Sequence, residues 1–144
     1  MTMRFVIAYV DESYQDGMYI LAAVLAHPDA ATARHTILDT RLRRQAIIHF
    51  VKESPKRRIQ HAETIARLDL PAVAAVRTSG ERPERARGRC LHTLAWALTG
   101  RASHIVIEDR QRTLNRHDRS VLTGPRHQPA PAPTFVAKPD EPLL

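Results

Sequence analysis

The feature that most constrains the fold is an apolar run that ends in two acids. Residues 5–10 are almost all apolar, which is typical of a buried strand, and Asp11 and Glu12 follow them. The turn pair Asp16-Gly17 comes next, and a second apolar run covers residues 18–26. The pattern predicts an antiparallel hairpin. A carboxylate at the end of a buried strand needs a paired charge or a bound cation, because burying it alone is costly.

Helices and strands alternate along the rest of the chain. Asp29 is the expected N-terminal cap of a first helix, and Ser54, followed by proline, is the cap of a second. Predicted strands lie at 4–11, 18–26, 46–51, 72–77, 103–108 and 134–137, and predicted helices at 29–44, 54–68, 83–98 and 113–123. This order predicts an α/β fold whose sheet is antiparallel at the hairpin and parallel elsewhere, with flanking helices.

The composition restricts the class of protein. The chain has 144 residues, which favours one domain, and 22 Lys and Arg against 15 Asp and Glu give it a net charge of +7. Nineteen of the basic residues are arginine, which suits phosphate groups, although a GC-rich genome would also raise arginine, alanine and proline together. The single cysteine, Cys90, excludes an internal disulfide and a multi-cysteine zinc site. The N-terminus has no signal-peptide pattern and no apolar run is long enough for a membrane span, so we expect a cytoplasmic protein.

The C-terminal segment differs in composition from the rest of the chain. Residues 124–144 contain six prolines, and a proline cannot donate a hydrogen bond to a sheet ladder. We therefore expect residues 1–123 to form a folded domain and residues 124–144 to form a proline-rich, poorly packed tail with one short edge strand at most.

Two predicted strands end in pairs of acids. Asp11 and Glu12 follow the first strand, and Glu108 and Asp109 close the strand at 103–108. Ligands usually bind at strand ends in open α/β sheets, and carboxylate oxygens suit Mg²⁺ or Mn²⁺. These four acids are therefore the candidate metal ligands, for a metal pair that activates water and stabilises the leaving oxygen in phosphodiester cleavage. The alternative, that they are ordinary turn or cap residues, stays open and is weakest for Asp11.

A second candidate cluster lies at the end of the predicted strand at 46–51. His49, Lys52 and Glu53 stand together just before the second helix. A histidine here can act as a general base or contact a scissile phosphate, a lysine can neutralise that phosphate, and a glutamate can bind a metal. The candidate catalytic residues are therefore Asp11, Glu53, His49 and Lys52. The alternative is a strand edge with solvated charges.

Basic residues also recur at the start of the predicted helix at 83–98. Arg82, Arg85 and Arg89 share one helical face, which fits a stripe that contacts a nucleic-acid backbone. Glu81 and Glu84 in register favour instead an ordinary solvated face. Aromatic residues make up 5% of the chain, which argues against base stacking on an aromatic platform. The motifs of P-loop enzymes, Rossmann oxidoreductases and zinc proteases are absent from the sequence.

Several blocks of the chain resemble a known family. They are Tyr9-Val10-Asp11-Glu12-Ser13 with the apolar run at 18–25, Ile-His-Phe-Val-Lys-Glu at 48–53, Ile-Val-Ile-Glu-Asp-Arg at 105–110 and Lys-Pro-Asp-Glu-Pro-Leu-Leu at 138–144. In this order they resemble the prokaryotic domain of unknown function 3800, most of all an actinobacterial branch of it. The resemblance implies a ribonuclease H-like fold, a metal-dependent nuclease activity, and a carboxylate role first for Asp11 and then for Glu53 and Glu108.

The resemblance also implies a longer chain. Members of this family continue past the Glu-Pro-Leu-Leu block into a helix with another acid, so we expect a truncated member with impaired catalysis. The missing helix would expose an apolar strip beside the first strand, which predicts self-association into a homo-oligomer. The strand order typical of ribonuclease H would place 72–77 beside the first strand and Glu108 two strands from Asp11, about 9–10 Å away.

The leading hypothesis from the sequence is a protein resembling a metal-dependent nuclease of the ribonuclease H-like class, with Mg²⁺ or Mn²⁺ as cofactor and a nucleic acid as partner. Whether such a protein is active or is inactive through truncation stays open at this point. The alternative is a non-catalytic module that binds nucleic acid or another protein.

Overall fold

The predicted hairpin forms the centre of a five-stranded sheet in the computed structural model, which describes residues 5–124 and 131–144. Strands β1 (Ile7–Gln15) and β2 (Met18–Ala26) pair antiparallel along their whole length. Asp16 and Gly17 make the turn, with φ of 50° and 76°. Positive φ at both central residues is what a type I′ hairpin turn requires, and Asp-Gly tolerates it well. This turn sets the register that places Gln15 opposite Met18.

Three further strands complete a mixed sheet. They are β3 (Ala72–Arg77), β4 (His104–Glu108) and β5 (Ala132–Val136), and the order across the sheet is β3-β2-β1-β4-β5. β3 pairs antiparallel with β2, whereas β4 pairs parallel with β1 and β5 parallel with β4. The strands at 72–77 and 104–108 therefore run in the same direction as β1, as predicted. The α/β class with an antiparallel hairpin and flanking helices, consistent with a ribonuclease H-like fold, is confirmed.

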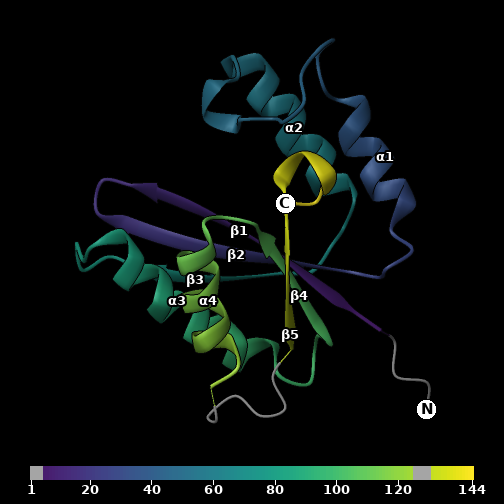
Figure 1. The fold of residues 1–144 in the computed structure, drawn as a ribbon. Helices are drawn as coiled ribbons and strands as arrows, with labels where there is room; N and C mark the ends of the chain where they lie inside the picture. Colours follow the sequence, from purple (N-terminus) through teal and green to yellow (C-terminus); the bar gives the residue numbers. More distant parts are fainter. Residues whose placement is uncertain (1–4, 125–130) are drawn as a thin grey trace.

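Helices cover both faces of the sheet (Figure 1). α3 (Pro83–Leu98) and α4 (Arg112–Leu122) lie on one face, and α1 (Ala31–Asp39) and α2 (Pro55–Arg67) on the other. Successive residues of a strand point to opposite faces, so β1 contributes to two cores. The α3 side buries Ala8, Val10, Leu21, Leu91, Leu94, Leu98, Ile105 and Ile107, and the α1 side buries Tyr9, Ala26, Ala33 and Leu143.

The segment at 46–51 is not a strand, which corrects the sequence prediction. Its end forms a 3₁₀ turn, η1 (Phe50–Lys52), in the connection between α1 and α2. A short apolar run does not by itself distinguish a strand from other buried structure, and here Ile48 and Phe50 line a cavity instead. The third strand is therefore 72–77, which lies beyond β2 and not beside β1. β4 takes the place beside β1, so Glu108 is one strand from Asp11 and not two.

The first helix is shorter than predicted. α1 begins after Ala30, which makes no side-chain capping bond, so Asp29 is not the cap. By contrast, the Ser54 hydroxyl accepts a hydrogen bond of 3.3 Å from the backbone N–H of Arg57 and caps α2 as predicted. β1 is longer than predicted and continues to Gln15, because β2 pairs with it beyond the point where β4 ends.

The described part of the C-terminal segment packs on the sheet, contrary to the expectation of a poorly packed tail. β5 is an edge strand beside β4, and an edge strand tolerates proline because only one side of its backbone is paired. A 3₁₀ turn, η3 (Lys138–Asp140), follows, and Leu143 is 9% exposed against Tyr9 and Ala26. Residues 125–130 lie outside the described part. The predicted homo-oligomer stays a prediction.

Candidate functional site

Asp11 and Glu108 lie side by side on adjacent parallel strands. Val10 of β1 is the register partner of Ile107 of β4, and one further step along both strands gives Asp11 and Glu108. Val10 and Ile107 face α3, so the two acids face the side of α1 and α2. Neighbouring strands are about 4.8 Å apart, which brings the two carboxyl groups within reach of one ligand.

Lys138 of η3 lies between these carboxylates. Its Nζ is 2.9 Å from Asp11 Oδ1 and 4.0 Å from Glu108 Oε2, so the two oxygens are at most 6.9 Å apart, the sum of the two distances. Lys138 was not among the residues predicted from the sequence, because it belongs to the closing block of the resemblance but has no local pattern that marks it. An ammonium between two carboxylates shows that this place in the fold favours a cation.

One oxygen of Asp11 is not satisfied by hydrogen bonds. Oδ1 is buried, and its partner is the Lys138 ammonium at 2.9 Å, which forms an ion pair with it without the geometry of a hydrogen bond. The side chains of Asp11 and Glu108 are otherwise 39% and 37% exposed, so solvent reaches both. A buried carboxylate oxygen paired with an ammonium, beside a second carboxylate open to water, offers the hard oxygen ligands that a divalent cation prefers.

A cavity of about 350 Å³ adjoins Asp11 on the same side of the sheet. His61 of α2 lies in its wall and is 4% exposed, and it was not among the residues predicted from the sequence. Most of the remaining wall is apolar: Val24, Ile37, Ile48, Phe50, Ile65, Leu68, Leu70, Leu143 and Leu144. The volume lies in the lower part of the range typical of small-ligand sites.

Glu53 is held by the surrounding loop and does not face a free site. Its carboxylate accepts hydrogen bonds of 2.7 Å from Gln45 Nε2 and 2.7 Å from Arg57 Nε, and His61 Nε2 is 3.9 Å away. The hydrogen bonds from Gln45 and Arg57 lower the pKa of Glu53 from its ordinary value. Glu53 therefore links Gln45, in the connection between α1 and α2, to Arg57 in the first turn of α2.

His49 and Lys52 are exposed, and the backbone N–H of Lys52 donates a hydrogen bond of 2.9 Å to the His49 carbonyl. The side chain of neither residue forms a hydrogen bond or ion pair with a described residue. They flank Phe50, which lines the cavity beside Asp11. The structure thus places the predicted catalytic cluster near the cavity, while Glu53 alone is tied into a fixed set of contacts.

Glu12 points to the opposite face of the sheet from Asp11. It accepts a hydrogen bond of 2.5 Å from the Tyr19 hydroxyl and pairs with Arg87 of α3. Burial raises the pKa of the Tyr19 hydroxyl, so it remains a donor. Glu12 therefore does not join the pair formed by Asp11 and Glu108.

Asp109 is separate as well. Its Oδ1 accepts a hydrogen bond of 2.5 Å from Asn115 Nδ2 of α4, and its backbone N–H donates to Val136 of β5. Among residues 5–124 and 131–144, no three His, Cys, Asp or Glu side chains are grouped to hold a metal. Of the four predicted ligands, the structure brings together Asp11 and Glu108.

No family model and no curated protein matches the chain. The resemblance to the domain of unknown function 3800 therefore stays a prediction from the sequence. None of the described helices is long and apolar enough to cross a membrane.

Proposed function

We propose that this protein hydrolyses phosphodiester bonds with one Mg²⁺ or Mn²⁺ ion bound by Asp11 and Glu108. The observation that carries the proposal is the pair of carboxylates on adjacent strands with a cation, the Lys138 ammonium, between them. The burial of Asp11 Oδ1, whose partner is this ammonium, supports it further. We also place this activity in the cytoplasm, where a chain with one buried cysteine and no disulfide is stable.

The two carboxylates fit a single ion. Mg²⁺ usually keeps several waters and binds to proteins through one or two carboxylates together with substrate phosphates. When bound, such an ion lowers the pKa of a coordinated water and polarises the phosphoryl group. Asp11 would supply the buried oxygen and Glu108 the more accessible one.

Lys138 has a second role in this proposal. A divalent ion competes with the ammonium for the same carboxylates, so Lys138 Nζ moves away as the ion binds. Its side chain is 22% exposed, which leaves it room to turn toward solvent. From there the ammonium can contact a phosphate oxygen of the substrate. The cavity beside Asp11 would receive an apolar part of the substrate next to the scissile group.

The experiment measures Mn²⁺ binding by calorimetry and cleavage of labelled single-stranded oligonucleotides with Mg²⁺ or Mn²⁺. Loss of an outer-shell partner already weakens metal binding about 10- to 100-fold, so Asp11→Asn should weaken Mn²⁺ binding at least about tenfold and abolish cleavage. Glu108→Gln should weaken both. Asp29→Asn is the matched control, because the Asp29 side chain is 91% exposed and lies outside the site.

The proposal fails if wild-type protein binds no Mn²⁺ at millimolar concentration, or if Asp11→Asn cleaves as fast as wild type. Binding of Mn²⁺ without cleavage would retain the metal site and refute the hydrolase activity. In that case the non-catalytic alternative would account for the fold.

A further inference from the structure

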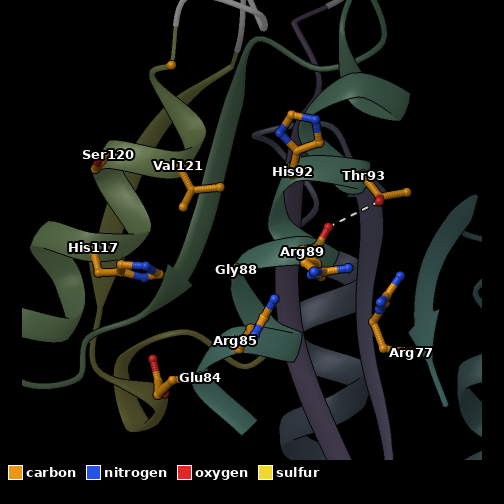
Figure 2. Close-up of a pocket in the computed structure, with 11 residues that line it drawn as sticks. Arg77, Glu84, Arg85, Gly88, Arg89, His92, Thr93, His117, Ser120 and Val121 are labelled. Atoms are coloured by element: carbon orange, nitrogen blue, oxygen red, sulfur yellow. Dashed lines mark hydrogen bonds between the residues drawn. The ribbon is translucent and has the colours of Figure 1, made fainter. Parts of the chain in front are cut away.

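A groove of about 740 Å³ runs along the outer side of α3, between α4 and the end of β3. Figure 2 shows Arg85, Arg89 and Thr93 on α3, with His117 reaching across from α4 and Arg77 on the other side. This groove lies on the face of the sheet opposite to Asp11 and Glu108. The groove and the proposed catalytic site are therefore separate surfaces.

The groove has an excess of positive charge. One carboxylate, Glu81, pairs with three arginines: Arg77 at 2.6 Å, Arg85 at 3.4 Å and Arg89 at 3.2 Å. The hydrogen bond from Ser79, followed by that from Arg77, lowers the pKa of Glu81, so its charge persists at neutral pH. Three guanidinium groups around one carboxylate leave two positive charges without a matching acid in this cluster.

The guanidinium groups of the outer two arginines remain accessible. The side chains of Arg85 and Arg89 are 70% and 48% exposed, and each lies nearest to Glu81 through its Nε. At this exposure the two guanidinium groups are accessible and can donate to phosphate oxygens in the planar arrangement that arginine favours.

An exposed tryptophan lies on the same helical face. Trp96 is 74% exposed, and it is the single tryptophan of the chain. Residues 85, 89 and 96 recur at spacings of four and seven, so they form one stripe about 16 Å long at 1.5 Å per residue. A large aromatic ring exposed beside arginines is suited to stack on an unpaired base. The low aromatic content of the chain argued against stacking, but the position of this one residue provides for it.

We propose that the outer face of α3 binds single-stranded nucleic acid, with Arg85 and Arg89 on the phosphates and Trp96 stacked on a base. Single strands are favoured over duplex because a base stacks on a side chain only when it is not stacked between its neighbours. The arginines supply the salt-dependent part of the binding free energy. The tryptophan adds a stacking contribution that is similar for all bases.

The test uses ten-nucleotide oligothymidylate and oligouridylate, the DNA and RNA forms of the ligand, with EDTA present so that the proposed metal site is silent. Because Trp96 is the only tryptophan, its intrinsic fluorescence reports directly on this face. We expect saturable quenching and an affinity that falls as salt rises. Comparison of the two oligonucleotides shows which sugar is preferred.

Variants locate the site by anisotropy of a labelled oligonucleotide. Trp96→Ala should weaken binding about fivefold or more, and Trp96→Phe should weaken it less because a ring remains. Arg89→Ala should weaken binding and make the salt dependence less steep. Arg67→Ala is the matched control, since Arg67 is an exposed arginine at the end of α2 on the other face, and it should bind like wild type.

Three results would overturn the proposal. One is binding too weak to quench Trp96 even at low salt. A second is an equal loss of affinity in Arg67→Ala and Arg89→Ala, which would indicate diffuse attraction by the net charge. The third is tighter binding to phosphatidylserine vesicles, or to an acidic peptide, than to either oligonucleotide, which would assign the face to another partner. Because no metal is present, none of these results bears on the activity proposed for Asp11 and Glu108.

Discussion

Replacement of Arg87 by methionine should destabilise the fold by about 3 kcal/mol. Arg87 projects from α3 into the layer between the sheet and α4, where its side chain is 3% exposed. Its Nη2 lies 2.9 Å from Asp118 Oδ2 of α4, and Asp118 is completely buried. The same guanidinium pairs with Glu12 of β1, so it connects two helices and the central strand. Methionine keeps much of the volume but removes the charge.

The magnitude follows from the carboxylate left behind. Removal of one partner of a buried ion pair typically costs about 3–5 kcal/mol, because the other charge stays buried without compensation. Here Arg110 Nη2 remains 2.8 Å from Asp118 Oδ1, which places the cost at the lower end of this range. For a chain of 144 residues, about 3 kcal/mol corresponds to a fall in Tm of about 6–12 °C.

Urea denaturation followed by circular dichroism measures this change. Arg85→Met is the matched control, because Arg85 lies two residues earlier on the same helix but is 70% exposed, 3.4 Å from Glu81. An exposed ion pair contributes at most about 1 kcal/mol, so this variant should unfold near the wild-type midpoint. Both variants replace an arginine by methionine, so the difference between their free energies of unfolding measures the effect of burying the ion pair.

The double variant Arg87→Met/Asp118→Leu tests the cause. If the cost comes from the uncompensated Asp118 carboxylate, its replacement by leucine should make the double variant more stable than Arg87→Met alone. A double variant that is less stable than Arg87→Met, or equal losses in Arg87→Met and Arg85→Met, would refute the reasoning.

Two further predictions concern charges on the α1 side of the sheet. Lys138→Met should tighten Mn²⁺ binding up to about fivefold in calorimetry, because the ammonium 2.9 Å from Asp11 no longer competes with the ion. The control is Lys56→Met on α2, which should bind Mn²⁺ like wild type. Unchanged or weaker binding in Lys138→Met would contradict this prediction. Hydrogen bonds from Gln45 and Arg57 lower the pKa of Glu53 in the folded state. The ionised carboxylate therefore stabilises the fold fully at a pH above the ordinary glutamate pKa of about 4.3. This stabilisation is lost as the pH falls through the folded-state pKa. Glu53→Gln should therefore lower Tm at pH 7 and have a smaller effect at pH 3; an equal effect at both pH values would show that the charge is not involved.

Elements with complete local signals could be predicted from the sequence. Asp16-Gly17 specifies a tight hairpin, and Ser54 followed by proline specifies a helix start, because each depends on the conformation of a few adjacent residues. The helix at 83–98 has the predicted bounds, since its apolar residues are regularly spaced over four turns. These features do not depend on the tertiary context.

Features that depend on distant partners could not be predicted in the same way. The apolar run at 46–51 lines a cavity, and the proline-rich segment at 132–136 becomes an edge strand because β4 offers it a free edge. Because 46–51 was counted as the third strand, the strand that carries Glu108 was predicted two places from β1, whereas it lies directly beside β1. Lys138 forms an ion pair with Asp11 because the fold places η3 next to the end of β1. No sequence pattern marks that contact.

The strand order also has a consequence for the sequence of folding events. β1, β2 and β3 follow one another along the chain as they do across the sheet, whereas the Ser103 hydroxyl reaches the backbone of Val6 across 97 residues. Closing so long a loop is slow compared with forming a hairpin, so we expect the N-terminal half of the sheet to form first and β4 to dock later. Asp11 and Glu108 therefore meet only when the final strands arrive. During synthesis, the chain would carry Asp11 long before Glu108 is made, so the proposed cation site would form only after β4 has docked.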